Sequence, residues 1–229
     1  ECASVVVPLD YNDLKAGDIH LAVARHKATK KTQQVVFLNP GGPGGSGIDY
    51  LEYWNEQFSA TLTANADLVS WDPRGVKRSA PVECISDAQM DADAEEDPTP
   101  DTPAEVEKFW STSTDEYHQC VEKTGNVLSH VSTIESAKDL DILRELLKQE
   151  TLNYLGKSYG TQLGATYAKL FPSKVGRFVL DGAVDVALST KQMSLDQAVG
   201  FDTAIHRMAR YCVENYNPCP IGSTPADVV

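Results

Sequence analysis

The stretch that decides the fold spans residues 155–164 and reads LGKSYGTQLG. The apolar run TLNYL at its start predicts a short buried strand, and TQLGATYAKLF predicts a helix that stops at Pro172. At the junction, Gly156 and Gly160 flank Ser158 in a Gly-x-Ser-x-Gly pattern. A serine at a sharp strand-to-helix turn adopts a strained backbone, and small residues on either side let the turn close. The pattern in this setting predicts that Ser158 is a catalytic nucleophile.

A glycine-rich loop is predicted where the apolar run VVFL ends, in the sequence NPGGPGGSG over residues 39–47. Glycine lets the main chain approach a substrate closely. Acyl transfer needs hydrogen-bond donors aimed at the developing oxyanion, and the backbone N–H of Tyr159, directly after Ser158, is one expected donor. A tight turn or a phosphate cradle is the alternative, but the loop matches neither the Walker A motif nor G-x-G-x-x-G. An oxyanion loop is therefore favoured.

Strand and helix patterns alternate from residue 35 to residue 182, which predicts a mostly parallel sheet with helices on both faces. Residues 3–11 and 19–28 predict an antiparallel pair of strands ahead of it. A helix is predicted over residues 48–58 and a strand over residues 67–75. The fold class predicted by these patterns is α/β, with a doubly wound sheet.

The sequence STIESAKDLDILRELL begins with Ser132 and has Glu135 three residues later, which is the pattern of a capping box. The apolar face of the helix predicted there consists of Ile134, Ala137, Leu140, Leu143 and Leu147.

Two segments depart from the alternating pattern. Residues 87–105 are dense in Asp, Glu and Pro and lack apolar periodicity, so they predict a solvated loop or insertion. After residue 185 the pattern turns helical, with a helix predicted over residues 195–211.

The composition limits the classes of function. A chain of 229 residues with 41% hydrophobic residues is enough for one α/β domain, or for part of a larger one. A net charge of −13 argues against binding to nucleic acid or to an anionic membrane surface, although it favours cationic ligands such as peptide amino termini. No apolar run is long enough to span a bilayer. The chain starts directly in a strand pattern without a signal peptide, so we expect a mature or trimmed polypeptide.

The chain has five cysteines, none in a CxxC pair or at zinc-ligand spacing, so no metal site or other cofactor is predicted. Their wide scatter favours disulfides in an oxidising compartment. The predicted pairs are Cys84–Cys120, around the acidic segment, and Cys212–Cys219, which closes a small loop. Cys2 is then either a buried free thiol or paired with sequence outside this chain, and we predict the second.

Several segments together resemble one branch of the α/β-hydrolases, the secreted tripeptidyl-aminopeptidase-like serine exopeptidases related to proline iminopeptidases. They are ECASVVVPLDY, FLNPGGPGGSG, LVSWDPRGVKRSAPVEC, STIESAKDLDILRELL and YLGKSYGTQLGATYAKLFPSKVGRFVLDGAVD. The resemblance implies an α/β-hydrolase fold in which residues 1–185 form the N-terminal part of the core. Residues 186–229 would then begin a helical lid. It also implies a secreted or cell-envelope location.

The resemblance also implies roles for particular residues. The family's Gly-Gly-Pro-Gly loop corresponds to residues 41–44, which makes the Gly42 N–H the second oxyanion donor. Its Asp-x-Arg-Gly turn corresponds to residues 72–75, so Asp72 and Arg74 are expected to support the site. Lys77 stands where relatives usually carry a second glycine, so the geometry of this turn is open.

The acid and base that would activate the serine are harder to find. In this fold the order is Ser, then Asp or Glu, then His. After Ser158 the only histidine is His206, in a predicted helix, and an Asp181–His206 pair is the disfavoured internal alternative. Lys157 is expected to point away from the serine. The earlier histidines are predicted to be surface or loop residues; they are His20, His26, His118 and His130.

The resemblance implies that the acid and base follow later strands, so a C-terminal segment or a companion chain is expected to supply them. The predicted function is a serine exopeptidase that releases amino acids or short peptides from peptide N-termini. An esterase or lipase of the same fold is the alternative, since the turn at Ser158 (the nucleophile elbow) and the oxyanion loop serve both reactions. A second alternative is a non-catalytic binding module of this fold.

Overall fold

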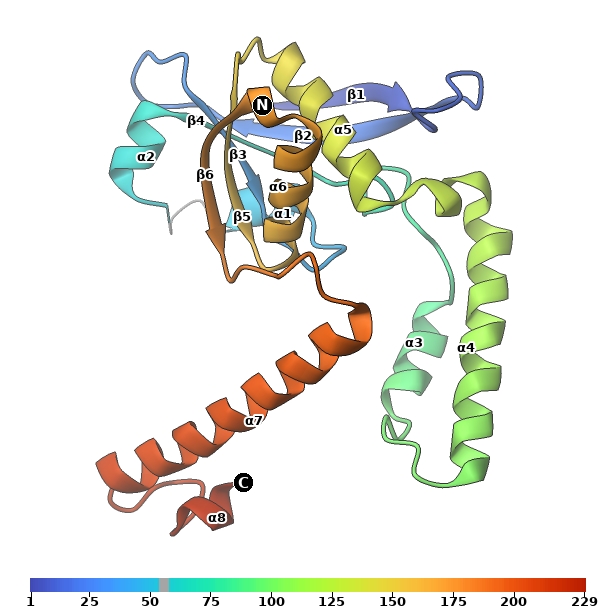
Figure 1. The fold of residues 1–229 in the computed structure, drawn as a ribbon, viewed down its shortest axis with the longest axis vertical. Helices are drawn as coiled ribbons and strands as arrows, with labels where there is room; N and C mark the ends of the chain where they lie inside the picture. The colour runs from blue at the N-terminus through green and yellow to red at the C-terminus, as the bar shows by residue number, and fades with distance from the viewer. Residues whose placement is uncertain (54–57) are drawn as a thin grey trace. The chain divides into compact units, whose positions relative to one another are not determined.

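The structure is a computed structural model that describes residues 1–53 and 58–229. Within them, six strands form one sheet in the order β1-β2-β4-β3-β5-β6 (Figure 1). β1 pairs with β2, and β2 with β4, in antiparallel fashion, whereas β4, β3, β5 and β6 run parallel. The strands are β1 (Cys2–Pro8), β2 (Asp18–His26), β3 (Val35–Asn39), β4 (Asp67–Trp71), β5 (Leu152–Lys157) and β6 (Val175–Asp181). The predicted antiparallel pair and parallel sheet are both confirmed.

Helices cover both faces of the sheet because side chains of the central strands alternate between two cores. Phe37 lies in the larger core with residues of α5 and α6, whereas Leu38 lies in the smaller one with residues of α1. These helices are α1 (Gly47–Tyr53), α2 (Ala60–Asn65), α5 (Thr133–Leu146) and α6 (Tyr159–Leu170). The helix predicted over residues 48–58 is α1 as far as Tyr53, and its residues 54–57 lie outside the described part of the chain.

The capping box at the start of α5 is confirmed. Ser132 Oγ accepts a hydrogen bond from the Glu135 N–H at 3.2 Å, and the Glu135 carboxylate accepts one from the Ser132 N–H at 3.4 Å. The predicted apolar face is only partly right, because Ile134 is 51% exposed while Leu140 is fully buried. A three-residue step falls about 60° short of a full helical turn, so Ile134 lies about 120° around the helix from Leu140.

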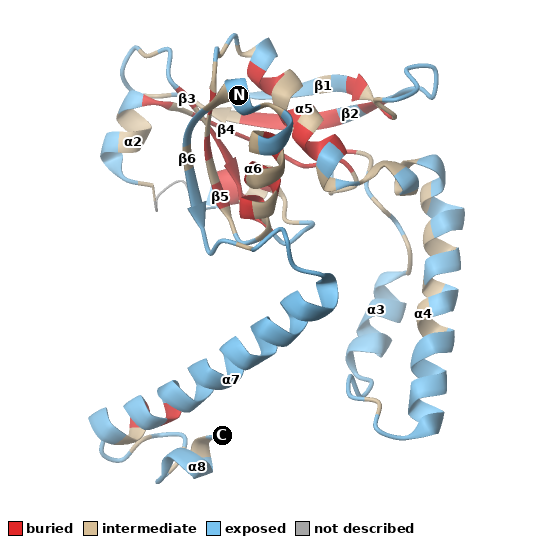
Figure 2. Ribbon diagram, in the orientation of Figure 1, coloured by how far each residue is buried: buried red, intermediate tan, exposed pale blue. Residues whose placement is uncertain are grey.

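The acidic segment corrects a prediction. Residues 87–105, expected to be a loop, contain α3 (Asp87–Ala94) and the start of α4 (Pro103–Thr124). Each helix begins with a capping box, on Ser86 and on Thr102. These local signals override the missing apolar periodicity. No residue of either helix is buried, so the segment is solvated as expected (Figure 2).

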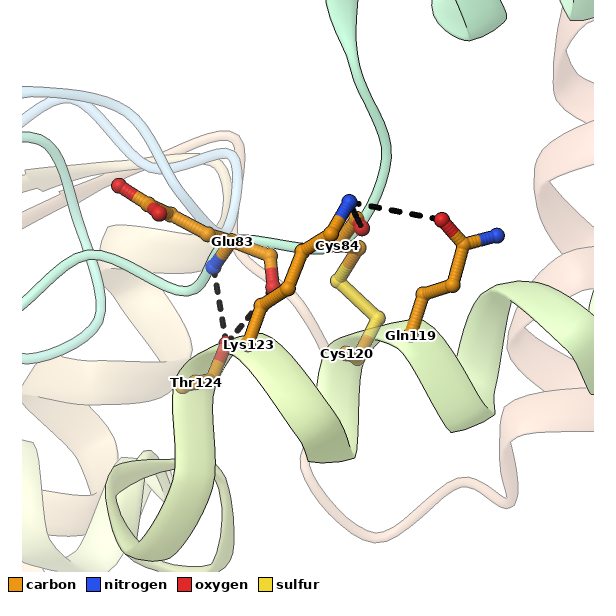
Figure 3. Close-up of a disulfide and its surroundings, with 6 residues drawn as sticks. All are labelled: Glu83, Cys84, Gln119, Cys120, Lys123 and Thr124. Atoms are coloured by element: carbon orange, nitrogen blue, oxygen red, sulfur yellow. Dashed lines mark hydrogen bonds between the residues drawn. A yellow bond between two sulfur atoms is a disulfide. The ribbon is translucent and has the colours of Figure 1, made fainter.

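A disulfide between Cys84 and Cys120 joins the two ends of the α3–α4 segment (Figure 3). Beside it, Thr124 Oγ1 donates to the Glu83 carbonyl and accepts from the Glu83 N–H, both at 2.9 Å. Lys123 Nζ donates to the Cys84 carbonyl. These contacts close a loop of 36 residues at its base.

The other predicted disulfide, Cys212–Cys219, is also present, so both pairings are confirmed. Cys2 is exposed and forms no disulfide within the described residues, which makes the buried-thiol alternative wrong.

The chain divides into two compact units, Glu1–Val184 and Asp185–Val229. The second unit consists of α7 (Thr190–Asn215) and α8 (Pro225–Val228), which contact each other. The helix predicted over residues 195–211 lies within α7. Among the described residues, we find no helix with the length and apolar character that a membrane span requires. That this unit is a lid stays a prediction.

Candidate active site

Ser158 stands between the end of β5 and the first residue of α6. Its φ of 52° and ψ of −123° lie in a region that non-glycine residues rarely adopt, which is the strained turn predicted from the glycine spacing. The turn is held from both sides. The Ser158 N–H donates to the Asp181 carbonyl of β6 at 2.9 Å, and the Ser158 carbonyl accepts from the Thr161 N–H at 2.9 Å. The Ser158 residue itself is exposed.

The two glycines of the motif are required by close contacts. A Cβ at Gly156 would lie 2.4 Å from the Gly160 carbonyl oxygen and 2.6 Å from the Tyr154 ring. A Cβ at Gly160 would lie 2.7 Å from the Asn39 carbonyl oxygen. Contacts under 3.0 Å are shorter than a real Cβ tolerates, so both positions exclude any larger side chain.

The glycine loop lies directly against this turn. A Cβ at Gly41 would lie 2.4 Å from the Lys157 carbonyl oxygen and 3.0 Å from the Tyr159 nitrogen. Gly41 and Gly42 have φ values of 95° and 114°, which favour glycine. The loop that follows β3 and the residue after Ser158 are therefore neighbours, as the sequence analysis expected for an oxyanion loop and its elbow.

The Tyr159 side chain is half-buried, and its hydroxyl lies 2.8 Å from Thr133 Oγ1 at the start of α5. Burial raises the pKa of Tyr159, so this hydroxyl stays neutral. The side chain thereby links the nucleophile elbow to α5. The expected chemical role of Tyr159 rests on its backbone N–H, as an oxyanion donor.

Asp72 anchors the far end of the glycine loop. Its carboxylate is fully buried and accepts hydrogen bonds from Ser46 Oγ at 2.5 Å and from the Ile48 N–H at 3.3 Å. The second oxygen accepts from Arg78 Nη1 at 3.0 Å. Asp72 thus joins the loop after β3 to the turn after β4. Arg78 is a participant that the sequence analysis missed, because nothing in its local pattern points to Asp72.

Arg74 is a structural residue rather than a group open to substrate. Its side chain is fully buried, and Nε and Nη2 form a two-pronged pair with Asp139, at 2.7 Å each. Burial lowers the pKa of Arg74, but Asp139, together with Glu135 and Tyr11, raises it above its ordinary value. The remaining N–H groups donate to the carbonyl oxygens of Pro8, Leu9 and His130. All five donors of the guanidinium are therefore used within the protein.

Lys77, where the resembled family has glycine, adopts a left-handed backbone with a φ of 41°. This conformation explains why glycine suits the position. Here the lysine side chain forms an ion pair with Asp49 of α1, which links the strained turn to the helix after the glycine loop.

Comparison with known proteins assigns the family. A model of the alpha/beta hydrolase fold matches residues 34–216, which include both the glycine loop and the Ser158 turn. The chain belongs to the α/β-hydrolase fold family. Its fold class is therefore as predicted.

Three relatives of this α/β-hydrolase bear on function. It is 40% identical to the serine protease Hip1 and 38% to carboxylesterase B, both from Mycobacterium tuberculosis, over 232 residues each. It is 36% identical over 235 residues to the tripeptidyl aminopeptidase of Streptomyces lividans. The predicted resemblance to tripeptidyl-aminopeptidase-like proteins is thus confirmed. Each alignment covers the whole of this chain and 44% of the relative, so the chain spans less than half the length of these proteins.

The contacts of Ser158 among the described residues do not identify a catalytic base for this α/β-hydrolase. Within residues 1–53 and 58–229, no hydrogen bond joins Ser158 Oγ to a histidine. His206 belongs to the second unit, where its Nδ1 lies 2.8 Å from the Asp202 carbonyl one helical turn earlier. The Lys157 amine lies over the Tyr50 ring of α1, 5.5 Å from the ring centroid.

The four earlier histidines, predicted to be surface or loop residues, lie in regular elements or at their ends. His20 and His26 belong to β2, His118 to α4, and His130 ends a 3-10 helix at Gly125–His130. His20 and His118 are exposed as expected. None of the four has a hydrogen bond to the Ser158 turn among the described residues.

One group of side chains has the spacing of a metal site. Ligand atoms of Asp10, His130 and Glu135 lie within 4.8 Å of one another. The Glu135 carboxylate already caps α5 and lies 3.0 Å from His130 Nδ1. His130 and Glu135 therefore already have partners within the protein, and acyl transfer by a serine needs no metal ion.

Proposed function

We propose that this chain carries the nucleophile and the oxyanion hole of a serine exopeptidase. Ser158 Oγ would attack the substrate carbonyl carbon, while the backbone N–H groups of Tyr159 and Gly42 hydrogen-bond the oxyanion. The observation that most supports this is the packing of the glycine loop on the elbow. A Cβ at Gly41 would lie 3.0 Å from the Tyr159 nitrogen, so the two expected donors are close in space.

The proposed reaction has two stages. The Oγ–C bond forms and the C–N bond of the peptide breaks, while the hydroxyl proton passes to a base and then to the departing amine. Water then attacks the acyl-enzyme with the help of the same base and releases the N-terminal fragment as an acid. A serine hydroxyl is a weak nucleophile at neutral pH, so the base is indispensable.

We further propose that an Asp and a His from a C-terminal segment or a companion chain complete the site. The exposure of β6 supports this. Among the described strands, β6 lies at the edge of the sheet, and its Val179 is 59% exposed. A parallel strand at the edge of an α/β sheet with bare apolar side chains favours coverage by further strands. We favour this over Asp181 and His206 as the acid and the base.

A peptide is the favoured substrate because two of the three relatives are named as peptidases. The net charge of −13 would favour the positive amino terminus of a peptide over an anionic acyl group. The relative named carboxylesterase B, at 38% identity, favours an ester substrate as the second candidate. The geometry of the elbow serves both reactions.

The two disulfides support a location outside the cytoplasm, because such bonds persist mainly in oxidising compartments. We therefore propose that the protein acts in the cell envelope or in the medium. Fractionation of the producing cells, followed by immunoblotting, tests this.

A fluorophosphonate probe tests the nucleophile in the polypeptide that includes this chain and the segment after it. The probe should label Ser158, and Ser158→Ala should abolish both labelling and hydrolysis of a peptidyl anilide. Ser173→Ala, at an exposed serine after α6, is the matched control and should retain both. Labelling of a different serine would refute the assignment. The ratio of kcat/KM for a peptidyl anilide and the corresponding ester then separates peptidase from esterase.

A further inference from the structure

Asn39, the last residue of β3, contacts both segments that carry the candidate oxyanion donors. Its side chain is buried, with 1% of the residue exposed. Asn39 Oδ1 accepts a hydrogen bond from the Gly41 N–H at 3.0 Å. Asn39 is also the pairing partner of Gly156 in the sheet, and its carbonyl oxygen would lie 2.7 Å from a Cβ at Gly160. The residue therefore lies between the glycine loop and the nucleophile turn.

The other polar atom of this side chain has no partner. Because the Gly41 N–H needs an acceptor, the oxygen must face Gly41 and the amide nitrogen must face the opposite way. Among the described residues, Asn39 Nδ2 is buried without a hydrogen bond. A buried donor left unpaired is destabilising, so its presence at a candidate site points to a ligand that takes the hydrogen bond.

Asn39 lines a pocket of about 310 Å³ beside the glycine loop. Its lining includes Gly41 and Tyr159, which lie at the nucleophile turn, and also Pro73 and Val82. This volume is near the lower end of the range for ligand sites. It suits a short piece of a larger substrate rather than a whole ligand.

The chemistry of the walls selects the kind of group that fits. Arg74 lines the pocket, but its five N–H groups are all used by Asp139 and three backbone carbonyls, so it offers nothing to an anion. No Asp or Glu is among the described residues that line the pocket, so a cation has no counterion there. A neutral hydrogen-bond acceptor with a small apolar body is what remains.

We propose that Asn39 Nδ2 donates a hydrogen bond, within this pocket, to a peptide carbonyl oxygen in the acyl part of the substrate. This rests on the proposed function, since the scissile carbonyl itself would occupy the oxyanion hole. The acceptor is then the carbonyl of the preceding residue. Asn39 is a specificity-determining residue: it favours acyl groups of at least two residues, and its Oδ1 holds the glycine loop in place at the same time.

The test is a double-mutant cycle between the Asn39 side chain and the substrate carbonyl that precedes the scissile one. It uses the polypeptide that includes residues 1–229 and the C-terminal segment proposed above. Two peptidyl anilides are compared, one natural and one with the preceding peptide bond replaced by a trans-alkene, which keeps the shape and removes the acceptor. Asn39→Asp keeps an oxygen for the Gly41 N–H and loses the donor once its carboxyl is ionised, so the assay is run at about pH 9, because burial raises the pKa of such a carboxyl above its ordinary value. Asn126→Asp, at an exposed position before α5, makes the same charge change elsewhere.

Asn39→Asp should lower kcat/KM about tenfold more for the natural anilide than for the alkene analogue, since this hydrogen bond is lost only in the first case. The Asn126→Asp control should match the wild type on both. An equal loss on both substrates would show that Asn39 acts only through the glycine loop, and this overturns the proposal. No loss on either would mean that water alone takes the hydrogen bond, which also overturns it.

Fluorophosphonate labelling separates this result from the proposed function. If Ser158 is labelled in both the wild type and Asn39→Asp but kcat/KM does not change, the inference fails and the nucleophile stands. If Ser158 is not labelled in the wild type, the proposed function itself fails. Should Asn39→Asp not fold, as judged by Tm, Asn39→Ala serves in the same cycle, because the difference between the two substrates still isolates the acceptor.

Discussion

The Tyr154 hydroxyl donates a 2.7 Å hydrogen bond to the Gly160 carbonyl, and so joins the strand before Ser158 to the helix after it. Both partners are buried, and the bond spans the strained residue from one side to the other. A serine held at a φ of 52° requires support from its surroundings, and this contact is part of that support.

Tyr154→Phe should destabilise the first unit by about 1 kcal/mol, because it removes this hydrogen bond while the ring still packs on Phe178. It should also slow fluorophosphonate labelling of Ser158. Denaturant unfolding and labelling rates measure the two effects. Tyr117→Phe, at a residue that is 60% exposed, is the control. Unchanged stability with Tyr154→Phe would show that the bond does not hold the turn.

Gly41→Ala should lower kcat about a hundredfold, the effect expected when one donor of an oxyanion hole is displaced. The added Cβ would lie 2.4 Å from the Lys157 carbonyl oxygen, so the loop must move. Steady-state kinetics on a peptidyl anilide measure this. Gly17→Ala is a matched control, since Gly17 also has a positive φ but a Cβ there meets nothing within 4 Å. Full activity in Gly41→Ala would contradict the proposed oxyanion loop.

Lys77→Gly should stabilise the protein slightly, by about 0.5–1 kcal/mol, because glycine adopts a φ of 41° without strain. The ion pair that is lost is partly exposed and contributes little. The Lys77 amine is the main cause of the lowered pKa of Asp49, so its contribution is present at neutral pH and disappears as pH falls below 3.8, the ordinary pKa of Asp. The advantage of Lys77→Gly should therefore grow at acid pH, as unfolding curves at neutral and acid pH would reveal. A clear loss of stability at all pH values would rule this out.

Peptide mapping without reduction should recover Cys84 linked to Cys120 and Cys212 linked to Cys219, with Cys2 linked to a peptide from outside residues 1–229. Loss of the 84–120 bond in Cys84→Ala should cost about 2–4 kcal/mol, because the bond limits the freedom of the unfolded loop. A peptide that links Cys2 to Cys84 would disprove this pairing.

His206→Ala should leave kcat and the pH profile unchanged in the longer polypeptide, since its Nδ1 contacts the Asp202 carbonyl within α7. Residues 1–229 alone should hydrolyse a peptidyl anilide several orders of magnitude more slowly than the polypeptide with the following segment, for lack of a base. Comparable rates from the two, together with inactivation by His206→Ala, would identify His206 as the base after all.

The sequence by itself determined the parts of this protein that depend on near neighbours. The Gly156–Gly160 spacing predicts a strained serine because a Cβ at Gly156 would meet the Gly160 carbonyl within the same turn. The alternation of strands and helices and the capping box at Ser132 are local in the same way. The caps at Ser86 and Thr102 are equally local signals, although the acidic composition around them is typical of a solvated loop.

Only the tertiary structure decided the contacts between distant residues. Arg74 and Asp139 are 65 residues apart, and no local pattern identifies them as a buried pair. The same holds for Asn39, whose unpaired amide is visible only once the glycine loop lies on the elbow. Hydrogen bonds depend on positions in space to within a few tenths of an ångström, which residue order does not specify. The strand order that brings β3 beside β5 is what sets those positions.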